Sequence, residues 1–474
     1  MVARNGTSTS ICQKEKRAIP AWGSSLCLLM QSVAFHTLGC KLNYAETATL
    51  SRQFSSRGFQ IVGIDDPAAI VVLNTCSVTE RADRECRQLV RRALRTSPQA
   101  YVIIVGCYAQ LQPETLGRIE GVDLILGASE KFDIFRHAEW KKTGVPRVRV
   151  SPISEATSFQ GASSADWSER TRAFLKIQDG CDYSCAFCTI PLARGESRSS
   201  PLPQILEDAR NAIAQGYREL VLTGVNVGDY GAKSQGSLLD VLQSLTKLDG
   251  LERIRISSVE PNLLTDELVD FWIESDKVCN HFHIPLQSGS PSVLSGMRRR
   301  YRREWYADRL ERIVRQAPQT GIGSDVIVGF PGESPSAFEE TYAFLVDQPL
   351  TYLHVFSYSK RPGTAAAERR DHVPAAVKAE RSERLRILSG KKRRAFHESL
   401  VGETTEVLFE SSGSVETGLT EHYAKVSVHS PTPLTNEIHA VRITEAGDAE
   451  CFGALTKEWV HYENRVHSIR AASL

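Results

Sequence analysis

The chain has 474 residues and a mass of 52.5 kDa, which at about 150 residues per domain predicts roughly three domains. Hydrophobic residues make up 41% and charged residues 24%, and this ordinary globular mixture excludes a disordered, collagen-like or coiled-coil protein. Because 57 basic residues nearly balance 56 acidic ones, no overall electrostatic field points to nucleic acid. No stretch approaches the roughly 18 apolar residues of a membrane span, so we expect no membrane partner.

The first 32 residues show neither periodicity nor a candidate ligand. Three basic residues before a short apolar stretch resemble a weak secretory signal, but Gln31 breaks the stretch and no clean cleavage site follows. Met30 directly precedes the first strand-like run and is an alternative initiator. We therefore interpret residues 1–32 as an extension that is disordered or arises from mistaken translation.

A chain that starts at Met30 is expected to fold and to be fully active, because the first predicted strand begins only near Val33. The comparison is the activity and the circular dichroism of the two chain lengths. Loss of either property in the shorter chain would show that the extension matters.

Strand-like and helix-like segments alternate over residues 33–145, which is typical of an open parallel sheet with helices on its faces. The predicted strands are 33–38, 69–74, 101–106 and 122–127. The segment 146–166 is rich in Ser, Pro and Ala and has no periodicity, so we interpret it as a linker.

A second alternating series fills residues 167–398. Its predicted strands are 172–178, 218–224, 253–259, 281–287, 323–330 and 351–358. Six successive βα units indicate a partial TIM-like barrel, with a doubly wound sheet as the alternative. The last part, 399–474, contains short alternating segments at 403–411, 423–430 and 437–444, which predict a small β-barrel.

Three cysteines fall within eight residues, at Cys181, Cys185 and Cys188, directly after a predicted barrel strand. A total of 11 cysteines, an odd number in so long a chain, favours a reducing compartment and metal ligands over disulfides. Three thiolates can hold three irons of a cubane cluster and leave the fourth iron open for a substrate or cofactor. The alternative is zinc, which requires a fourth ligand that the neighbouring sequence does not supply.

Three further cysteines, Cys40, Cys76 and Cys107, each follow a predicted strand of the first domain. Parallel strands present their carboxyl ends along one edge of a sheet, so residues far apart in sequence can converge there. The pattern predicts a second metal site. The alternative is three buried, inert cysteines, because free cysteine is among the most buried residue types.

The spacing Cys-x₃-Cys-x-aromatic-Cys, in which Phe187 is the aromatic residue, resembles the signature of the radical S-adenosylmethionine superfamily. The resemblance implies a 4Fe–4S cluster whose open iron binds the methionyl group, and cleavage of the cofactor to a 5′-deoxyadenosyl radical. Thr223, Gly224 and Gly329 end predicted strands where the superfamily contacts the cofactor, although glycines after strands are usually plain turns.

The segments HTLGCKLNYAET (36–47), LNTCSVTERADRECRQLVRR (73–92) and VGCYAQLQPE (105–114) resemble the N-terminal domain of the methylthiotransferases. KIQDGCDYSCAFCTIPLARGESRS (176–199) resembles their radical domain, and the last seventy residues resemble their RNA-binding TRAM domain. This resemblance implies that Cys40, Cys76 and Cys107 bind an auxiliary 4Fe–4S cluster. Five cysteines fit no ligand pattern: Cys12, Cys27, Cys86, Cys279 and Cys451.

The first two motifs are most similar to the subgroup that acts on N6-threonylcarbamoyladenosine at position 37 of tRNA. The resemblance implies addition of a methylthio group at carbon 2, with one S-adenosylmethionine as radical source and another as methyl donor. The alternatives are N6-isopentenyladenosine in tRNA and an aspartate of a ribosomal protein. The implied partners are a tRNA anticodon stem-loop, an electron donor of flavodoxin or ferredoxin type and an unknown sulfur donor, all in the cytoplasm.

Two basic runs are candidate RNA contacts, because Lys and Arg bind phosphate by charge and counterion release. The blander interpretation is that such runs are solvated helix faces. The candidate residues are Arg298, Arg299, Arg300, Lys391, Lys392, Arg393 and Arg394.

Overall fold

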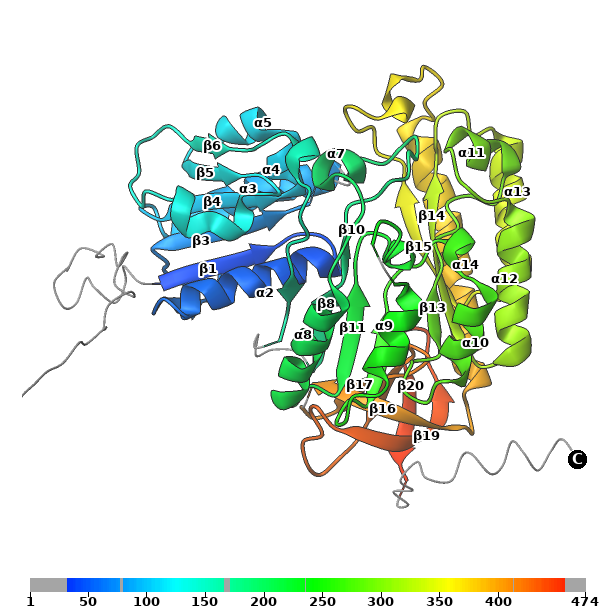
Figure 1. The fold of residues 1–474 in the computed structure, drawn as a ribbon. Coiled ribbons are helices and arrows are strands. Elements are labelled where there is room, and N and C mark those ends of the chain that lie inside the picture. The colour runs from blue at the N-terminus through cyan, green and yellow to red at the C-terminus, as the bar shows by residue number, and fades with distance from the viewer. Residues whose placement is uncertain (1–31, 77–79, 166–170, 235, 412, 457–474) are drawn as a thin grey trace, which may run out of the picture.

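The protein was examined as a computed structural model, which describes residues 32–76, 80–165, 171–234, 236–411 and 413–456. Within these ranges no helix is both long and apolar enough to cross a membrane. The proposed extension and two cysteines without a ligand pattern, Cys12 and Cys27, lie outside the described residues, except that Ser32 already belongs to the first strand. Figure 1 shows an N-terminal α/β unit beside a central α/β unit, with a small all-β unit below the central one.

Six parallel strands form the first sheet, in the order β2–β1–β3–β4–β5–β6. Their bounds are β1 Ser32–Thr37, β2 Gln60–Val62, β3 Ile70–Thr75, β4 Tyr101–Gly106, β5 Val122–Leu126 and β6 Arg147–Arg149. One face packs against α3 (Glu80–Thr96), and the other against α2 (Lys41–Ser55). The short helices are α4 (Cys107–Leu111), α5 (Pro113–Gly117) and α6 (Ile134–His137). Because helices cover both faces, β3 and β4 are buried along their whole length. The predicted parallel sheet is confirmed.

Six parallel strands of the central unit follow one another in chain order. They are β8 Arg172–Lys176, β11 Glu219–Thr223, β12 Arg253–Ile256, β13 His281–His283, β14 Gly321–Val328 and β15 Tyr352–Ser357. The set β12–β11–β8 is joined to β13–β14–β15 through single bridges at Ile254–Val278 and Ser258–His283. This unbroken order is that of a partial barrel and not of a doubly wound sheet, in which the order reverses.

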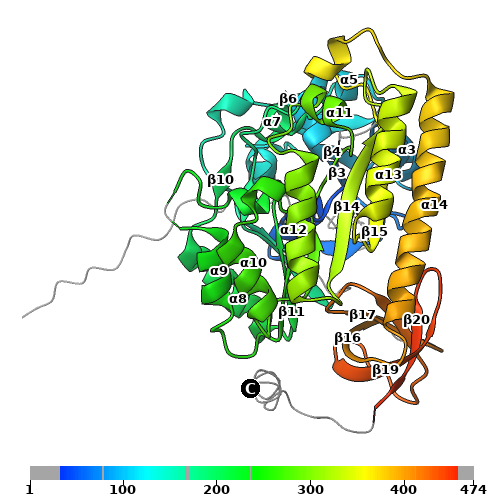
Figure 2. The same ribbon diagram turned by 90° about the vertical axis from the view of Figure 1, so that its right-hand side faces the viewer.

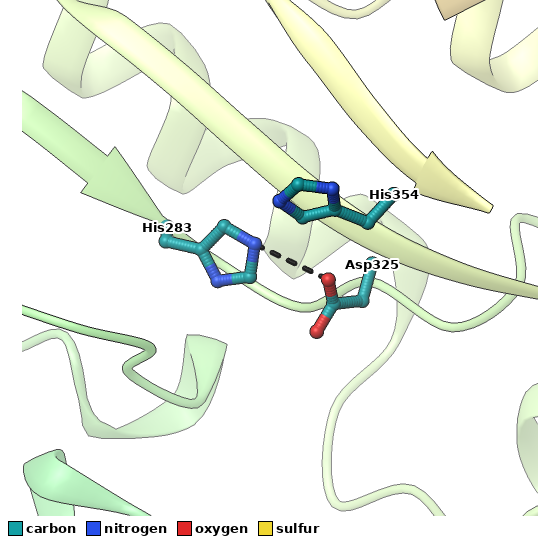
Figure 3. Close-up of side chains that lie close together, drawn as sticks. All are labelled: His283, Asp325 and His354. Carbon is teal, nitrogen blue, oxygen red and sulfur yellow. Dashed lines mark ion pairs between the residues drawn. The ribbon is translucent and has the colours of Figure 1, made fainter. Parts of the chain in front are cut away.

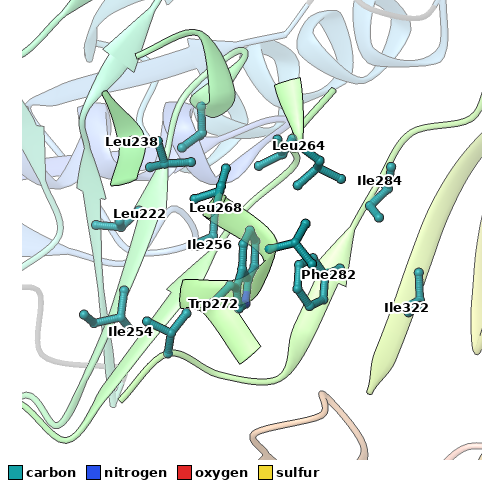
Figure 4. Packing of buried hydrophobic residues seen from close by; sticks show 14 of the residues in the cluster. Leu222, Leu238, Ile254, Ile256, Leu264, Leu268, Trp272, Phe282, Ile284 and Ile322 are labelled. Atoms are coloured by element: carbon teal, nitrogen blue, oxygen red, sulfur yellow. The ribbon is translucent and has the colours of Figure 1, made fainter. Parts of the chain in front are cut away.

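Helices cover the outside of the partial barrel. They are α8 Leu202–Ala214, α9 Leu238–Leu245, α10 Asp266–Glu274, α12 Arg303–Gln316, α13 Pro335–Asp347 and α14 Ala375–Ser399, with two short helices, α7 Ile190–Arg194 and α11 Pro291–Gly296. Figure 2 shows α12, α13 and α14 along one side of β14 and β15. The core between strands and helices is continuous, and Trp272 of α10 stacks on Phe282 of β13 with ring centroids 4.1 Å apart (Figure 4).

The predicted linker, 146–166, was wrong in part, because two short strands lie within it. β6 pairs with β5 in the first sheet, and β7 (Ala162–Ser163) pairs antiparallel with β8 in the central one. Strands of two or three residues leave no periodic signal, which is why the sequence pattern missed them. The segment therefore attaches one sheet directly to the other. Two further two-residue strands, β9 (Gln178–Asp179) and β10 (Arg198–Ser199), pair beside the cysteine loop.

The C-terminal unit is a closed five-stranded barrel in the order β16–β17–β18–β20–β19. The strands are β16 Thr404–Ser411, β17 Glu416–Thr420, β18 Lys425–Val428, β19 Ile438–Ala446 and β20 Cys451–Leu455. The predicted small β-barrel is confirmed, although β17 and β20 were not predicted. Buried Arg255 donates from β12 to the carbonyl oxygens of Thr420 (3.1 Å) and Glu421 (2.9 Å), which fastens this barrel to the central unit.

Candidate functional site

The three clustered cysteines lie in the loop after β9, at the carboxyl end of the first barrel strand. Each sulfur accepts one hydrogen bond: Cys181 from the Tyr183 backbone N–H (3.4 Å), Cys188 from the Ile190 backbone N–H (3.4 Å), and Cys185 from Nη1 of Arg299 (3.1 Å). Hydrogen bonds to sulfur are a feature of protein sites that ligate iron–sulfur clusters, where they tune the cluster. All three sulfurs are thus provided with a donor.

The backbone before this loop requires a glycine. Gly180 has φ +72°, and a Cβ atom there would lie 1.9 Å from the carbonyl oxygen of Glu196. The next residue, Cys181, donates its backbone N–H to the carbonyl oxygen of Gly195 at 3.0 Å. The start of the cysteine loop therefore packs closely against the backbone of residues 195–196.

A cavity of about 1020 Å³ lies over the loop. Its lining includes all three cysteines, residues 195–199, Arg298, residues 363–365 and, from the segment before β7, Ile153, Ser154, Ala156, Thr157 and Phe159. This volume suits a cofactor-sized ligand, since small-molecule sites typically span about 300–1,000 Å³.

The donor set was tested against the two alternatives that the sequence left open. Burial raises the pKa of Cys181 to about 11 and that of Cys188 to about 12, so these thiols need a metal to become thiolates. Among the described residues, the sulfurs of neither cysteine trio all lie within 4.8 Å of one another. One tetrahedral zinc ion would draw its sulfurs to about 3.8 Å. A cubane binds each cysteine through a different iron and so does not require the sulfurs to lie this close together.

The other residues predicted to contact the cofactor surround this loop. Thr223 is buried at the end of β11, and its carbonyl oxygen accepts the Ile177 N–H at 2.9 Å. A Cβ atom on Gly224 would lie 3.0 Å from Gln178, whose Oε1 accepts the N–H groups of Val225 and Asn226 at 3.0 and 2.9 Å. Gln178 therefore shapes the turn after β11, and cofactor binding by Thr223 and Gly224 stays a prediction.

Two further cofactor predictions have structural explanations of their own. Phe187 packs against a small apolar cluster that includes Met297 and Phe330. Gly329 has φ +72°, and its Cβ position is occupied by the side chain of Lys378 from α14, with Cγ only 2.2 Å away. The glycine is thus required by chain packing, whether or not a cofactor approaches it.

Arg299 is a correction to the predicted RNA contacts. Its side chain is only 3% exposed, and its guanidinium pairs with Glu260 and bonds the Cys185 sulfur, which leaves it no route to a phosphate. The two flanking arginines are exposed. Arg300 lies 3.9 Å above the Tyr183 ring and bonds the Asp182 carbonyl oxygen, and Arg298 lines the cavity. These two remain predicted RNA contacts.

The run 391–394 does not form one basic surface. Lys392 donates to the carbonyl oxygens of Val346 and Gln348 and so caps the end of α13, which removes it from the candidate RNA contacts. Arg394 is paired with acidic groups of α14 and of the small barrel. Lys391 is exposed, and Arg393 lies near the inner strand β15, close enough to influence the pKa of His354.

The three dispersed cysteines lie at the carboxyl ends of three adjacent strands. Cys76 directly follows β3, Cys107 directly follows β4, and Cys40 comes three residues after β1 ends. Glycine makes this approach possible, because a Cβ atom on Gly39 would lie 2.6 Å from the Cβ of Cys76. The predicted convergence at the sheet edge therefore has a geometric basis. By contrast, Cys86, Cys279 and Cys451 are buried. Cys86 and Cys451 belong to hydrophobic clusters, and Cys279 lies near the charged side chains of Arg255 and Glu219.

A buried ionic cluster, which sequence reasoning missed, joins the first domain to the barrel beside these cysteines. It consists of Glu46 and Lys131 from the first domain and Lys176, Asp179 and Arg194 from the barrel. Glu46 contacts Lys131 (2.6 Å), Arg194 (2.9 Å) and Lys176 (3.0 Å), and Asp179 contacts Lys176 (2.6 Å) and Arg194 (3.0 Å). Burial alone would raise the pKa of Glu46, but the three cations hold that pKa well below its ordinary value. The charge of Arg194 also acts on the thiol of Cys107.

Glu46→Gln is expected to destabilise the protein by about 3–5 kcal/mol, because three buried cations would then face one carboxylate. Thermal unfolding of the full chain measures the effect. Glu398→Gln, which breaks an exposed pair with Arg394, is the matched control and should cost less than about 1 kcal/mol. Equal unfolding temperatures for the two variants would contradict this role for Glu46.

Comparison with known proteins agrees with the geometry. Residues 175–345 match the radical SAM superfamily, and residues 32–127 match a family described as uncharacterised protein family UPF0004. A solved structure of the radical S-adenosylmethionine methyltransferase TsrM from Kitasatospora setae shares the fold with a TM-score of 0.51, at 17% identity over 71% of this chain and 75% of that one. The fold and the cysteine loop thus define a radical S-adenosylmethionine protein, whose cofactors include S-adenosylmethionine and a 4Fe–4S cluster.

Curated relatives match nearly the whole chain. The threonylcarbamoyladenosine tRNA methylthiotransferase MtaB of Bacillus subtilis is 39% identical over 88% of this chain and 95% of its own length. The protein of the same name in Aquifex aeolicus is 38% identical over 83% of this chain and 96% of its own length. The tRNA-2-methylthio-N(6)-dimethylallyladenosine synthase of Syntrophotalea carbinolica is 34% identical over 81% of this chain and 89% of its own length. The chain belongs to the methylthiotransferase family.

Proposed function

We propose that this enzyme adds a methylthio group to carbon 2 of N6-threonylcarbamoyladenosine at position 37 of tRNA. The observation that carries the proposal is that two cysteine trios lie in two domains joined by a buried ionic cluster. One iron–sulfur site suffices to generate a radical, and a second site gives the sulfur chemistry its own location. The names of relatives at 38–39% identity support the threonylcarbamoyl substrate.

In this proposal Cys181, Cys185 and Cys188 hold the radical cluster. When bound, the cluster and S-adenosylmethionine would supply the radical chemistry by which sulfur replaces hydrogen at an unactivated aromatic carbon. The chain's own residues orient and shield these groups. Arg299, held by Glu260, donates to the Cys185 sulfur, and the clamped Gly180 turn fixes the loop over the cavity.

Cys40, Cys76 and Cys107 would hold the auxiliary 4Fe–4S cluster. Their thiol donor set fits iron, and their sulfurs are not gathered as one zinc ion requires. Arg194, which contacts both Glu46 and Asp179, brings a buried positive charge near Cys107. A cation at this point favours the thiolate form of that ligand.

The proposed partners follow from this reaction. A tRNA anticodon stem-loop would contact exposed Arg298 and Arg300 at the cavity. A flavodoxin or ferredoxin type of protein would supply electrons, and a separate donor would supply sulfur. Because tRNA is the proposed substrate, we expect the protein to act in the cytoplasm.

Nucleoside mass spectrometry of tRNA from a deletion strain tests the substrate. The expected result is loss of 2-methylthio-N6-threonylcarbamoyladenosine and accumulation of N6-threonylcarbamoyladenosine. Expression of the wild-type chain should restore the methylthio nucleoside. Loss of the methylthio form of isopentenyladenosine, or of methylthioaspartate in a ribosomal protein, would establish one of the alternatives. Stoichiometric zinc without iron after anaerobic reconstitution would refute the methylthiotransferase mechanism as a whole.

A further inference from the structure

Three polar side chains gather on the inner face of the barrel, on strands β13, β14 and β15. His283, Asp325 and His354 each present a ligand atom, and these atoms all lie within 4.8 Å of one another (Figure 3). Side chains alternate between the two faces of a strand. Since Phe282, Val326 and Leu353 pack into the core under the helices, the three polar residues face the inside.

These side chains have unused hydrogen-bonding capacity. The Nδ1 atom of His283 lies 2.7 Å from the Ser258 hydroxyl, which fixes the orientation of the ring. Its Nε2 atom is buried 3.2 Å from Asp325 Oδ1, yet it has no hydrogen bond of acceptable geometry among the described residues. His354 is exposed on this inner face. A buried polar atom without a partner is costly, so a ligand that satisfied it would be favoured.

The charges that surround the three side chains leave an excess of positive charge. Lys41 and Arg393 act electrostatically on His354, against the single carboxylate of Asp325. Burial lowers the pKa of His354, and the electrostatic effects of His283, Lys41 and Arg393 act in the same direction, while Asp325 opposes them. The Glu260 carboxylate also interacts with Asp325, but it is paired with Arg299. The remaining two cations and one carboxylate favour a ligand that carries one negative charge.

An aromatic side chain lies next to this group on the same strand. Phe356 is two residues beyond His354 on β15, so both side chains point inward, about 7 Å apart along the strand. It is 44% exposed, which is unusual for phenylalanine on a barrel interior. Phe356 is also nearer the carboxyl ends of the strands, where the cysteine loop lies. An exposed ring at this place is suited to stacking on a nucleobase.

We propose that His283, Asp325 and His354 form the subsite that receives the threonylcarbamoyl group, while Phe356 stacks on the adenine ring. This inference rests on the proposed function. The threonylcarbamoyl group carries a carboxylate that accepts hydrogen bonds and a hydroxyl and ureido N–H groups that donate them. The imidazoles supply donors and Asp325 supplies an acceptor, so the two sets are complementary. The adenine would then lie between the subsite and the radical site, with the modified substituent pointing down the barrel.

Binding to two anticodon stem-loops tests the subsite, one with threonylcarbamoyladenosine and one with unmodified adenosine at position 37. The reconstituted wild-type enzyme is expected to prefer the modified stem-loop. In His354→Phe and in Asp325→Asn this preference should fall by at least about tenfold, because the first change removes a donor and the second replaces a charged acceptor by a neutral amide. Affinity for the unmodified stem-loop and iron content report whether each variant is folded. His137→Phe, at the end of α6 in the first domain, is the matched control and should keep the preference.

Three outcomes would overturn the subsite. Both variants could retain the wild-type preference, or the wild-type enzyme could bind the two stem-loops equally. One zinc or other divalent ion per chain that disappears in His354→Phe would assign the residues to a metal site instead. The nucleoside analysis of tRNA tests the proposed function, and the binding comparison tests the subsite. The two proposals can therefore fail independently.

Discussion

Replacing any one of Cys181, Cys185 and Cys188 by alanine is expected to abolish cleavage of S-adenosylmethionine. Three ligands are the minimum that holds a cubane with one open iron, and each of these sulfurs is already matched by a donor at 3.1–3.4 Å. Removing one thiol therefore removes a metal bond and also leaves a donor without its acceptor. We expect release of 5′-deoxyadenosine to fall to background in each variant.

The measurement is 5′-deoxyadenosine released under reducing, anaerobic conditions, together with iron content. Cys279→Ala is the control, because that thiol is even more buried, with 2% exposure, than the half-buried loop cysteines but belongs to no predicted ligand set. It should cleave the cofactor normally. A triple alanine variant of the loop that still produced 5′-deoxyadenosine would refute the assignment of the radical cluster.

A triple variant of Cys40, Cys76 and Cys107 is expected to separate the two halves of the reaction. These residues lie at the edge of the first sheet, which has its own hydrophobic layers on both faces. The cysteine loop of the barrel does not depend on them. The variant should therefore still cleave S-adenosylmethionine, although slowly, and should add no methylthio group to tRNA.

Iron content, deoxyadenosine release and tRNA nucleosides are to be measured on the same preparation. About four irons per chain, in place of about eight, would agree with loss of one of two clusters. Cys86→Ala, in the same domain but on the buried face of α3, is the control and should keep both clusters. Unchanged iron with normal methylthiolation would eliminate the auxiliary cluster and most of the reason for a sulfur-inserting mechanism.

The positions of both cysteine trios could be inferred from sequence because they depend on strand ends alone. Cys76 and Cys107 follow runs of buried β-branched residues, which are strong strand signals. Adjacent parallel strands must then bring those ends to one edge. The same reasoning correctly gave six βα units for the barrel, since each strand is a short apolar run between polar helices.

Side-chain direction could not be inferred in this way. Arg298, Arg299 and Arg300 look equivalent in the sequence. In the structure the backbone of Arg298 is left-handed, with φ +59°, and the side chains of Arg298 and Arg300 are exposed while that of Arg299 is buried. The ionic cluster around Glu46 draws on segments more than a hundred residues apart. The inner group of His283, Asp325 and His354 depends on the register of three strands, which a sequence pattern does not specify.

The ionic cluster between the first domain and the barrel has a consequence for how the enzyme can work. Burying these five charges costs desolvation energy, and their mutual attraction offsets that cost only while all five are in contact. Opening the contact would remove this attraction. Hinge motion between the two domains is therefore energetically opposed, and the two cysteine sites keep a constant separation throughout a catalytic cycle. Steps that need both sites must then be completed at that fixed separation, without closure of one domain on the other.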